Sequence, residues 1–475
     1  MALDKLLKKG LLWSALEVLV KRVFDFFVKL VLARLLFPEE FGVVGMAAVF
    51  TTFVQVVSEM GIGAALIQRK KEELKEIHFQ TAFWFGFVWS VVLYLLVFFV
   101  LTPLIADFYN EPILLKVIPI LSLPILISSI NNVNKAQLMR ELDFKKLAIV
   151  NNSSSIIAGV GAILLAVNDF GIWALVFNAV VPFFVAIPLL FYATKWVPKL
   201  VWDRVAFKEI FSFGIYTFGT ALILNIAANI DYLVIGKLVD AAALGAYTLA
   251  FMLTGLVSSQ ITSMLNRVMF PFYSSIQSNI NNVKSYYLKV VGYSALLIYP
   301  IMLSLIVLAG PILSMLFGDK WVDTKVPLRI LSVAVLVNVF TSSYNLLYRS
   351  LGRPRLEMKI LFCMLIFVII PSITIGGYYY DVRGVAYGIL LASIINFVVV
   401  SILLYRHFNI RLITIVKQLM PSIIAFILTF YIITSLYLYT EIHSIILLVF
   451  LFVVFYSICY LFYKKEVKNI FKKFI

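Results

Sequence analysis

The segment from Phe79 to Thr102 reads FQTAFWFGFVWSVVLYLLVFFVLT and contains no charged residue in 24 positions. A helix rises roughly 1.5 Å per residue, so about 20 apolar residues cross the bilayer core of about 30 Å. Similar runs, such as Leu390–Leu404, recur along the 475-residue chain. Apolar residues make up 63% of it and charged residues 13%, whereas soluble domains hold about 45–50% and about 25%. The sequence therefore predicts an all-α integral membrane protein.

Apolar length and polar breaks predict about fourteen transmembrane helices. We expect a six-helix N-terminal lobe at 1–205, a six-helix C-terminal lobe at 206–404, and an extra helix pair with a basic tail at 405–475. The predicted spans cover residues 10–36, 41–67, 79–102, 113–137, 147–167, 172–194, 210–236, 244–271, 287–309, 328–350, 359–376, 384–404, 417–437 and 444–463.

The basic residues in the loops predict the orientation. Loops on the side of the N-terminus hold 26 Lys or Arg. The opposite loops hold only four, namely Lys237, Lys320, Lys325 and Arg383. Cytoplasmic loops carry the excess of Lys and Arg, so we expect both termini in the cytoplasm. The same bias explains the net charge of +16 without a nucleic-acid partner.

Catalytic and cofactor motifs are absent from the sequence. Cys363 and Cys459 both lie in apolar runs, and the three histidines are far apart and lack the spacing of metal ligands. No GxSxG, HExxH, P-loop or DxD motif is present. The glycine pair Gly159 and Gly161 follows no predicted strand, and we expect it to allow close helix packing. We expect neither an enzyme nor a bound cofactor or metal.

The two six-span sets resemble each other. The residues Arg34-Leu35-Leu36, Phe41-Gly42 and Ala47 match Lys237-Leu238-Val239, Leu244-Gly245 and Ala250 at a constant offset of 203. An even number of spans per copy gives both copies one orientation, so their axis should run along the membrane normal. Chance similarity between Leu-rich spans is the alternative. Parallel repeats of this kind form two lobes with a binding site between them.

Several segments carry a resemblance to a known family. They are Leu32–Gly42 (LARLLFPEEFG), Asn229–Tyr232 (NIDY), Leu244–Tyr247 (LGAY) and Phe270-Pro271. The chain resembles the bacterial polysaccharide flippases of O-antigen, colanic acid and teichuronic acid type. These belong to the multidrug/oligosaccharidyl-lipid/polysaccharide exporter superfamily. The resemblance implies two six-helix lobes around a central cavity, and movement of lipid-linked oligosaccharide across the inner membrane by alternating access.

The first span carries five charged residues in its interior. With 3.6 residues per turn they fall within one arc of about 140°; they are Glu17, Lys21, Arg22, Asp25 and Lys29. Each central charge costs roughly 2.5–3.5 kcal/mol to insert, so this stripe should line a wet cavity or contact other spans. A self-neutralising i,i+4 ladder of Glu17, Lys21, Asp25 and Lys29 is the structural alternative. Arg22 has no acid four residues away and does not belong to that ladder.

Other spans add polar groups that could line the same cavity. We interpret Lys21, Arg22 and Lys29 together with the following residues as candidate substrate-binding groups: Lys135, Asn225, Asn229, Arg267 and Arg349. The candidate ion-coupling acids are Glu17, Asp25, Glu59 and Asp231. For most of these residues, anchoring a helix end or packing between helices is an equally good interpretation. Within the predicted spans ten Lys or Arg stand against four acids, and a cationic cavity suits a pyrophosphate.

The sequence and the resemblance together predict a flippase of surface-polysaccharide or lipopolysaccharide biosynthesis. Its expected substrate is an undecaprenyl-pyrophosphate-linked oligosaccharide, carried from the cytoplasmic to the periplasmic leaflet with coupling to H⁺ or Na⁺. The alternatives are a multidrug or peptidoglycan-precursor exporter of the same superfamily and a membrane glycan polymerase. No connection between predicted spans exceeds eighteen residues, which disfavours a polymerase with a large catalytic loop.

Overall fold

The protein is helical throughout the part of the chain that the structure describes. This is a computed structural model of the 475 residues. It describes residues 2–68, 74–276, 279–341, 344–350, 354–439 and 443–474. Close contacts divide the chain into two compact units, Met1–Gly245 and Ala246–Ile475. The predicted lobe boundaries at 205 and 404 stay predictions.

The first unit is helical, and two of its predicted spans are interrupted. The span predicted at 113–137 is present as the membrane-length segment Leu114–Arg140. Pro119 and Pro124 each remove a backbone donor, and the segment is divided into three consecutive helices. A break with positive φ at Met60 and Gly61 likewise divides the predicted span 41–67. The elements are α1 (Ala2–Leu35), α2 (Pro38–Glu59), α3 (Ile62–Gln68), α4 (Glu76–Leu96), η1 (Val97–Leu101, a π-helix), α5 (Thr102–Tyr109), α6 (Leu114–Leu121), α7 (Leu123–Leu126), α8 (Ser128–Arg140), α9 (Phe144–Val167), α10 (Ile172–Thr194) and α11 (Arg204–Leu238).

The second unit packs around α13, and 72% of the most apolar stretch of this helix is buried. Leu303 and Val307 of α13 pack against Ile433, Leu447 and Leu451 of the last two helices, so the C-terminal pair is part of this unit. The elements are α12 (Ala241–Ser275, begun in the first unit), α13 (Ile280–Val307), α14 (Ala309–Leu316), η2 (Asp319–Thr324, 3₁₀), α15 (Lys325–Thr341), α16 (Tyr344–Ser350), α17 (Pro354–Met364), η3 (Leu365–Ile369, a π-helix), α18 (Ile370–Phe408), α19 (Leu412–Tyr439) and α20 (Ser444–Phe474).

Eleven helices within the described residues are long and apolar enough to cross a membrane, which confirms an all-α membrane protein. One of the eleven, Leu356–Phe408, is interrupted by non-helical torsions at Tyr380 and Asp381. Gly376 and Gly384 approach each other closely across this turn. The helix α1 is long enough to span, but its interior charges keep it out of the eleven. The predicted number of about fourteen spans stays a prediction.

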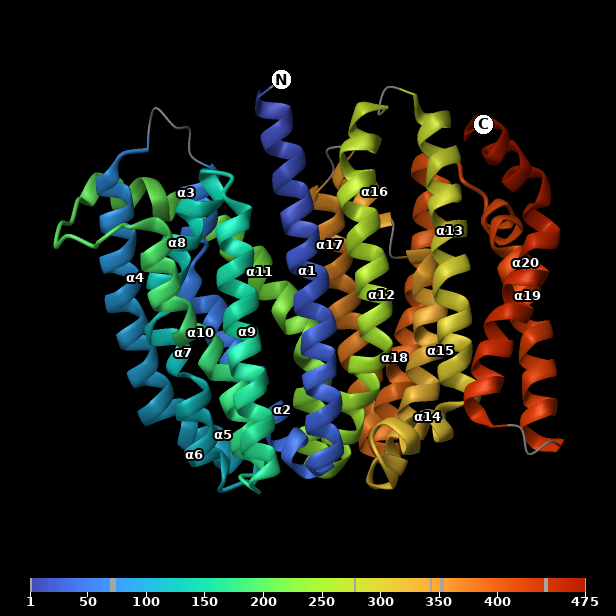
Figure 1. Ribbon diagram of the computed structural model, residues 1–475, viewed down its shortest axis with the longest axis horizontal. Helices are drawn as coiled ribbons and strands as arrows, with labels where there is room; N and C mark the ends of the chain where they lie inside the picture. The colour runs from blue at the N-terminus through green and yellow to red at the C-terminus, as the bar shows by residue number, and fades with distance from the viewer. Residues whose placement is uncertain are drawn as a thin grey trace. The chain divides into compact units, whose positions relative to one another are not determined.

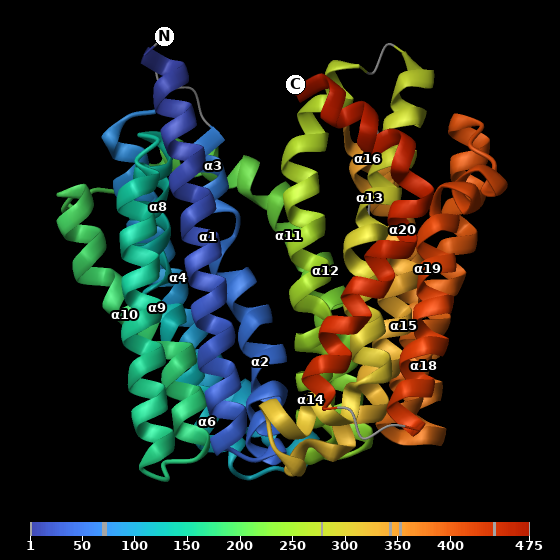
Figure 2. The same cartoon turned by 45° about the vertical axis from the view of Figure 1, so that its right-hand side comes forward.

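In the first unit, α1 lies along α9, as Figures 1 and 2 both show. The close approach depends on Gly159, because a Cβ there would lie 2.6 Å from both the Phe24 ring and a Val28 methyl. A Cβ on Gly161 would likewise collide with the Phe177 ring of α10. The prediction that this glycine pair serves helix packing is confirmed.

Helix boundaries follow the internal repeat. The helix α1 ends at Leu35 and α11 ends at Leu238, while α2 begins at Pro38 and α12 at Ala241. Both differences equal the sequence offset of 203. The caps also correspond: the Glu40 carboxylate accepts from the backbone N–H of Phe37 at 2.7 Å, and the Asp240 carboxylate accepts from that of Ala243 at 2.7 Å. The two helix junctions are therefore equivalent parts of the repeat.

The two junctions contact each other through glycines. A Cβ on Gly42 would collide with the Ala241 carbonyl, and a Cβ on Gly245 would collide with the Pro38 carbonyl. Positions 42 and 245 differ by the offset of 203, and so do positions 38 and 241. The two contacts are therefore equivalent in the repeat. This reciprocity is what a two-fold relation between equivalent segments produces.

We predict that Gly42→Ala destabilises the protein, because its methyl group would meet a backbone carbonyl that cannot rotate away. Overpacking of this kind costs about 1–3 kcal/mol. The matched control is Gly63→Ala, since a Cβ on Gly63 meets nothing within 4 Å. Thermal unfolding of the purified protein in detergent should show a lower midpoint for Gly42→Ala only. Equal midpoints for the two variants would contradict the reciprocal contact.

Candidate functional site

The charged stripe of α1 borders a cavity inside the first unit. The cavity has a volume of about 320 Å³ and is lined by residues of α1, α8, α9 and α10. The ionisable side chains in its lining are Lys21, Asp25, Lys29 and Lys135. Polar groups of α9 and α10 complete the polar part of the wall, namely Asn151, Ser154, Ser155 and Asn178.

The polar side of α1 is tied to α9 by hydrogen bonds. The Lys21 ammonium donates to the Ser155 hydroxyl at 2.7 Å and lies 3.1 Å from the Asp25 carboxylate. One turn earlier, the Asn151 amide donates to the Glu17 carboxylate at 2.7 Å. The Lys21 and Asp25 side chains remain 42% and 40% exposed, so they can still contact a ligand or water.

Lys135 reaches the cavity from α8. It interacts electrostatically with Glu59 of α2, with Glu17 and with Lys21. Its neighbours on α8 have packing roles instead, because the Asn134 side chain accepts from the Thr194 hydroxyl at 2.7 Å. Asn131 and Asn134 are both buried. The one α8 residue that the sequence selected as a ligand group is thus the one that lines the cavity.

The lining is cationic. Three lysines and one aspartate give its ionisable groups a formal charge of +2. The two further acids near these lysines, Glu17 and Glu59, are not part of the lining. Ammonium groups bind phosphate oxygens as point charges, and hydroxyl and amide groups donate to them as well. The wall can therefore bind an anion with several acceptor oxygens.

The other predicted site residues whose side chains the structure describes do not line this cavity. Asn225 and Asn229 face an apolar cavity of about 220 Å³ between α2 and α11, where the Asn229 amide donates to the Asn225 backbone carbonyl at 2.8 Å. Asp231 is buried, and its carboxylate accepts from the Tyr232 backbone N–H at 3.0 Å. Arg22 is exposed and lies outside the lining.

Two predicted ligand groups cannot be placed. The side chains of Arg267 and Arg349 lie outside the described residues. The structure thus brings Lys21, Asp25, Lys29 and Lys135 together, while the roles of all the predicted site residues stay predictions.

The polar wall that α9 supplies was not predicted from the sequence. Its signal was the run Asn151-Asn152-Ser153-Ser154-Ser155 in the middle of a predicted span. Ser154 and Ser155 are buried. A serine hydroxyl in a helix can donate a hydrogen bond to a backbone carbonyl of the same helix, as Ser154 does to the Val150 carbonyl at 2.7 Å. Among the described residues, no three His, Cys, Asp or Glu side chains are grouped so that they could hold a metal ion.

Comparison with solved structures supports the fold. The lipid II flippase MurJ, in an inward closed conformation, matches with a TM-score of 0.78. The match covers 96% of this chain and 100% of that one at 16% identity. This likeness shows that the two chains share a common fold.

Comparison with sequences gives relatives in polysaccharide biosynthesis. The teichuronic acid biosynthesis protein TuaB of Bacillus subtilis is 25% identical over 74% of this chain and 73% of its own length. The lipopolysaccharide biosynthesis protein WzxC of Escherichia coli is 25% identical over 82% and 78%. A family model described as polysaccharide biosynthesis protein matches residues 31–326. That segment is more than half of the chain, so the chain belongs to the polysaccharide biosynthesis protein family.

Proposed function

We propose that the protein is a flippase for undecaprenyl-pyrophosphate-linked oligosaccharide. It moves the repeat unit from the cytoplasmic to the periplasmic leaflet by alternating access, with the lipid chain kept in the bilayer. The observation that carries this proposal is the cationic cavity beside α1, together with membership of the polysaccharide biosynthesis family. The names of the relatives, which refer to teichuronic acid, lipopolysaccharide and lipid II, are consistent with a lipid-linked sugar substrate.

In this proposal the three lysines of the lining bind the pyrophosphate. Lys21 keeps its hydrogen bond to Ser155 and its ion pair with Asp25, while Lys29 and Lys135 supply the additional positive charge. The sugars contact Asn151 and Asn178, whose amides can both donate and accept. The protein performs no covalent step, because transport changes only the position of the substrate.

The coupling ion would act through carboxylates that neighbour these lysines. Asp25 lies beside Lys21, and Glu59 interacts electrostatically with Lys135. Protonation of either acid would raise the positive charge around the cavity, so proton binding and anion binding would favour each other. Glu17 and Asp231 remain further candidates, although Glu17 is held by Asn151 and Asp231 lies away from the cavity.

We predict that Lys135→Ala reduces transport of the lipid-linked oligosaccharide. Losing one charge-assisted hydrogen bond costs about 1.5–3 kcal/mol, which corresponds to about tenfold to hundredfold weaker binding. Lys135→Arg should retain part of the activity because the charge remains. The measurement is movement of the lipid-linked substrate across vesicles that contain equal amounts of protein.

The matched control is Lys146→Ala. Lys146 pairs with Asp143 at 3.1 Å, and both side chains are partly exposed, so this surface pair contributes little. Transport by the control should equal that of the unaltered protein. Full transport by Lys135→Ala would contradict a role of the cavity in substrate binding. Efflux of a cationic dye by the unaltered protein, without transport of lipid-linked sugar, would favour a multidrug exporter instead.

We predict the orientation from the 26-to-4 distribution of loop Lys and Arg. A reporter fused after Lys146, at the start of α9, should be cytoplasmic. Reporters fused near Asp107, at the end of α5, and near Asp319 should be periplasmic. Paired alkaline phosphatase and green fluorescent protein fusions measure the two sides. A periplasmic signal at Lys146 would contradict the orientation and the proposed direction of transport.

A further inference from the structure

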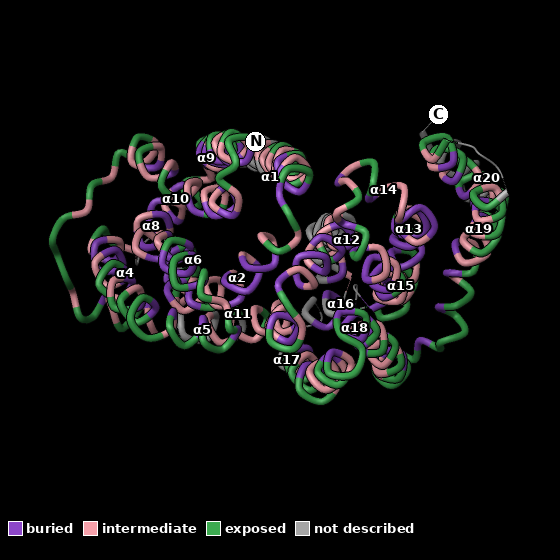
Figure 3. The backbone as a smooth tube through the Cα atoms, turned by 90° about the horizontal axis from the view of Figure 1, so that it is seen from below, coloured by how far each residue is buried: buried purple, intermediate pink, exposed green. Residues whose placement is uncertain are grey.

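The connection between α10 and α11 has an ordered, extended path. Residues 195–203 are not helical and pass outside α4, where Figure 3 shows most of the tube as exposed. We call residues 195–205 the strap. Its backbone is fixed to α4: the Lys199 N–H donates to the Gln80 side chain at 2.6 Å, and the Trp84 indole donates to the Lys199 carbonyl at 2.7 Å. The Asp203 N–H donates to the Thr81 hydroxyl at 3.2 Å.

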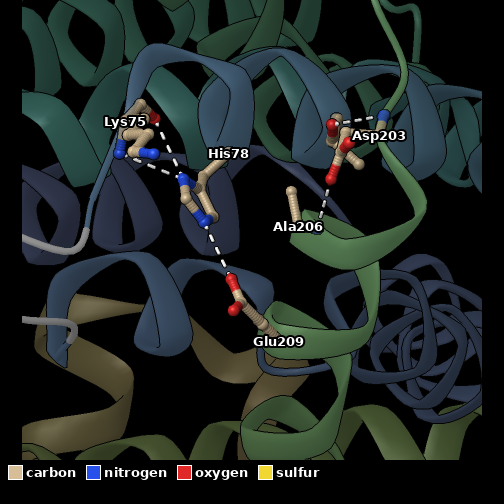
Figure 4. A network of polar contacts seen from close by, with 6 residues as sticks. Lys75, His78, Asp203, Ala206 and Glu209 are labelled. Atoms are coloured by element: carbon tan, nitrogen blue, oxygen red, sulfur yellow. Dashed lines mark hydrogen bonds and ion pairs between the residues drawn. The ribbon is translucent and has the colours of Figure 1, made fainter.

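Two acids, one in the strap and one in the second turn of α11, are directed toward the protein. The Asp203 carboxylate caps α11 by accepting from the Ala206 N–H at 2.6 Å. The Glu209 carboxylate lies 3.1 Å from Nε2 of the buried His78, whose Nδ1 contacts the backbone of Lys75 (Figure 4). These contacts hold the first turns of α4 and α11 together, and they leave the outward side of the strap without carboxylates of its own.

The outward side of the strap is apolar. Leu200 is 84% exposed, Val197 70%, Val205 65% and Trp202 52%. With Val201, five large apolar side chains are exposed within nine residues. They form a patch that soluble surfaces seldom present, and such patches mark sites of interaction. One side of Trp202 packs on Phe207, with ring centres 5.3 Å apart, so the patch has a defined shape.

Basic side chains accompany the apolar patch. All four basic residues of 195–209 are exposed; they are Lys195, Lys199, Arg204 and Lys208. Lys199 also lies 4.0 Å from the Glu76 carboxylate, at the limit of an ion pair. An aromatic, aliphatic and basic surface of this composition is typical of segments that lie in the plane of a membrane interface.

Chain continuity places the strap at that interface. It follows directly on Thr194, the last residue of the apolar 23-residue helix α10. Its hydrogen bonds reach Gln80, Thr81 and Trp84, near the start of the membrane-length segment Glu76–Tyr109. A segment tied to the ends of two spans lies at the depth of the lipid headgroups.

We propose that the strap binds anionic phospholipids, with its apolar side chains inserted below the headgroups and its cations bound to lipid phosphates. Charge complementarity favours anionic over zwitterionic lipid. Because the strap is hydrogen-bonded to α4 and continues into α11, this binding fixes the start of α11 to the same lipid plane as α4. The proposal does not depend on what the cavity beside α1 transports.

The first experiment measures where the strap lies. Leu200→Cys, in full-length protein with Cys363→Ser and Cys459→Ser, is labelled with an environment-sensitive fluorophore. The protein is reconstituted into vesicles of phosphatidylcholine and phosphatidylglycerol. The control is Glu141→Cys, at the exposed turn before α9. We expect lipid-borne spin labels to quench the label at 200 and aqueous iodide to quench the label at 141.

The opposite pattern would overturn the proposal. If iodide quenches the label at 200 as strongly as the label at 141, the strap lies in water. If the label at 200 is shielded from iodide in native membranes but not in vesicles, the strap binds a protein partner rather than lipid. Val197→Cys provides a second labelling position if Leu200→Cys does not fold.

The second experiment measures lipid selectivity. Energy transfer from the label at 200 to headgroup-labelled phosphatidylglycerol is compared with transfer to headgroup-labelled phosphatidylcholine. Each Lys or Arg near an anionic surface strengthens binding roughly fivefold. The double variant Lys195→Gln/Lys199→Gln should therefore lose roughly tenfold or more of the preference for phosphatidylglycerol. Salt should weaken the preference of the unaltered protein, because mobile ions screen exposed charges.

The matched control for selectivity is Lys145→Gln/Lys146→Gln, which removes two exposed lysines at the start of α9. It should keep the preference for phosphatidylglycerol. Equal loss in both double variants would show that overall protein charge attracts the lipid, and this would overturn a specific role for the strap.

Discussion

A charge in the hydrocarbon layer needs a partner or water, and this requirement determines how α1 is packed. The helix carries both signs of charge in its interior, so it cannot face lipid on that side. In the structure Asn151 holds Glu17, and Asp25 and Ser155 hold Lys21. The apolar residues Phe24 and Val28 pack on Gly159 of the same partner helix. One neighbour, α9, thus provides both the polar partners and the apolar packing surface of α1, and the cavity is lined by α1, α8, α9 and α10.

The reciprocal contact at the two helix junctions shows that matching positions of the sequence repeat make matching contacts in the structure. Gly42 meets the Ala241 carbonyl, and Gly245 meets the Pro38 carbonyl. Both glycines must lack a side chain, because each one meets a backbone carbonyl rather than a side chain that could rearrange. Chance similarity between Leu-rich spans would not explain why the two matching glycines each contact the carbonyl at the matching position of the other junction. The contact therefore supports an internal repeat, in which the equivalent junctions meet as a two-fold pair.

The sequence predicted the helices well where the length of an apolar run determines the structure. It predicted poorly which neighbouring helix or cavity a given side chain contacts. The predicted span 172–194 coincides with α10, because an uninterrupted apolar run has one stable structure in lipid. The breaks at Met60 and between α6, α7 and α8 depend on local backbone geometry that apolar length does not report. At the site, the period of 3.6 correctly placed Lys21, Asp25 and Lys29 together. It could not show that Arg22, at one edge of the same arc, lies outside the cavity lining, nor that Asn225 and Asn229 face an apolar cavity.

The distribution of charge around the cavity reconciles insertion into a membrane with binding of an anion. Lys21, Lys29 and Lys135 are balanced in number by Glu17, Asp25 and Glu59, so the whole cluster carries no net charge when these groups are ionised. Only Asp25 among the three acids belongs to the lining. The cluster is therefore close to neutral for the surrounding lipid, while the surface that a ligand meets is positive. A pyrophosphate could bind there without leaving an unpaired buried charge after its departure, because the lysines return to the acids that already neighbour them. Such a site can bind and release its ligand in turn, which transport requires and which a permanently unpaired cationic pocket would resist.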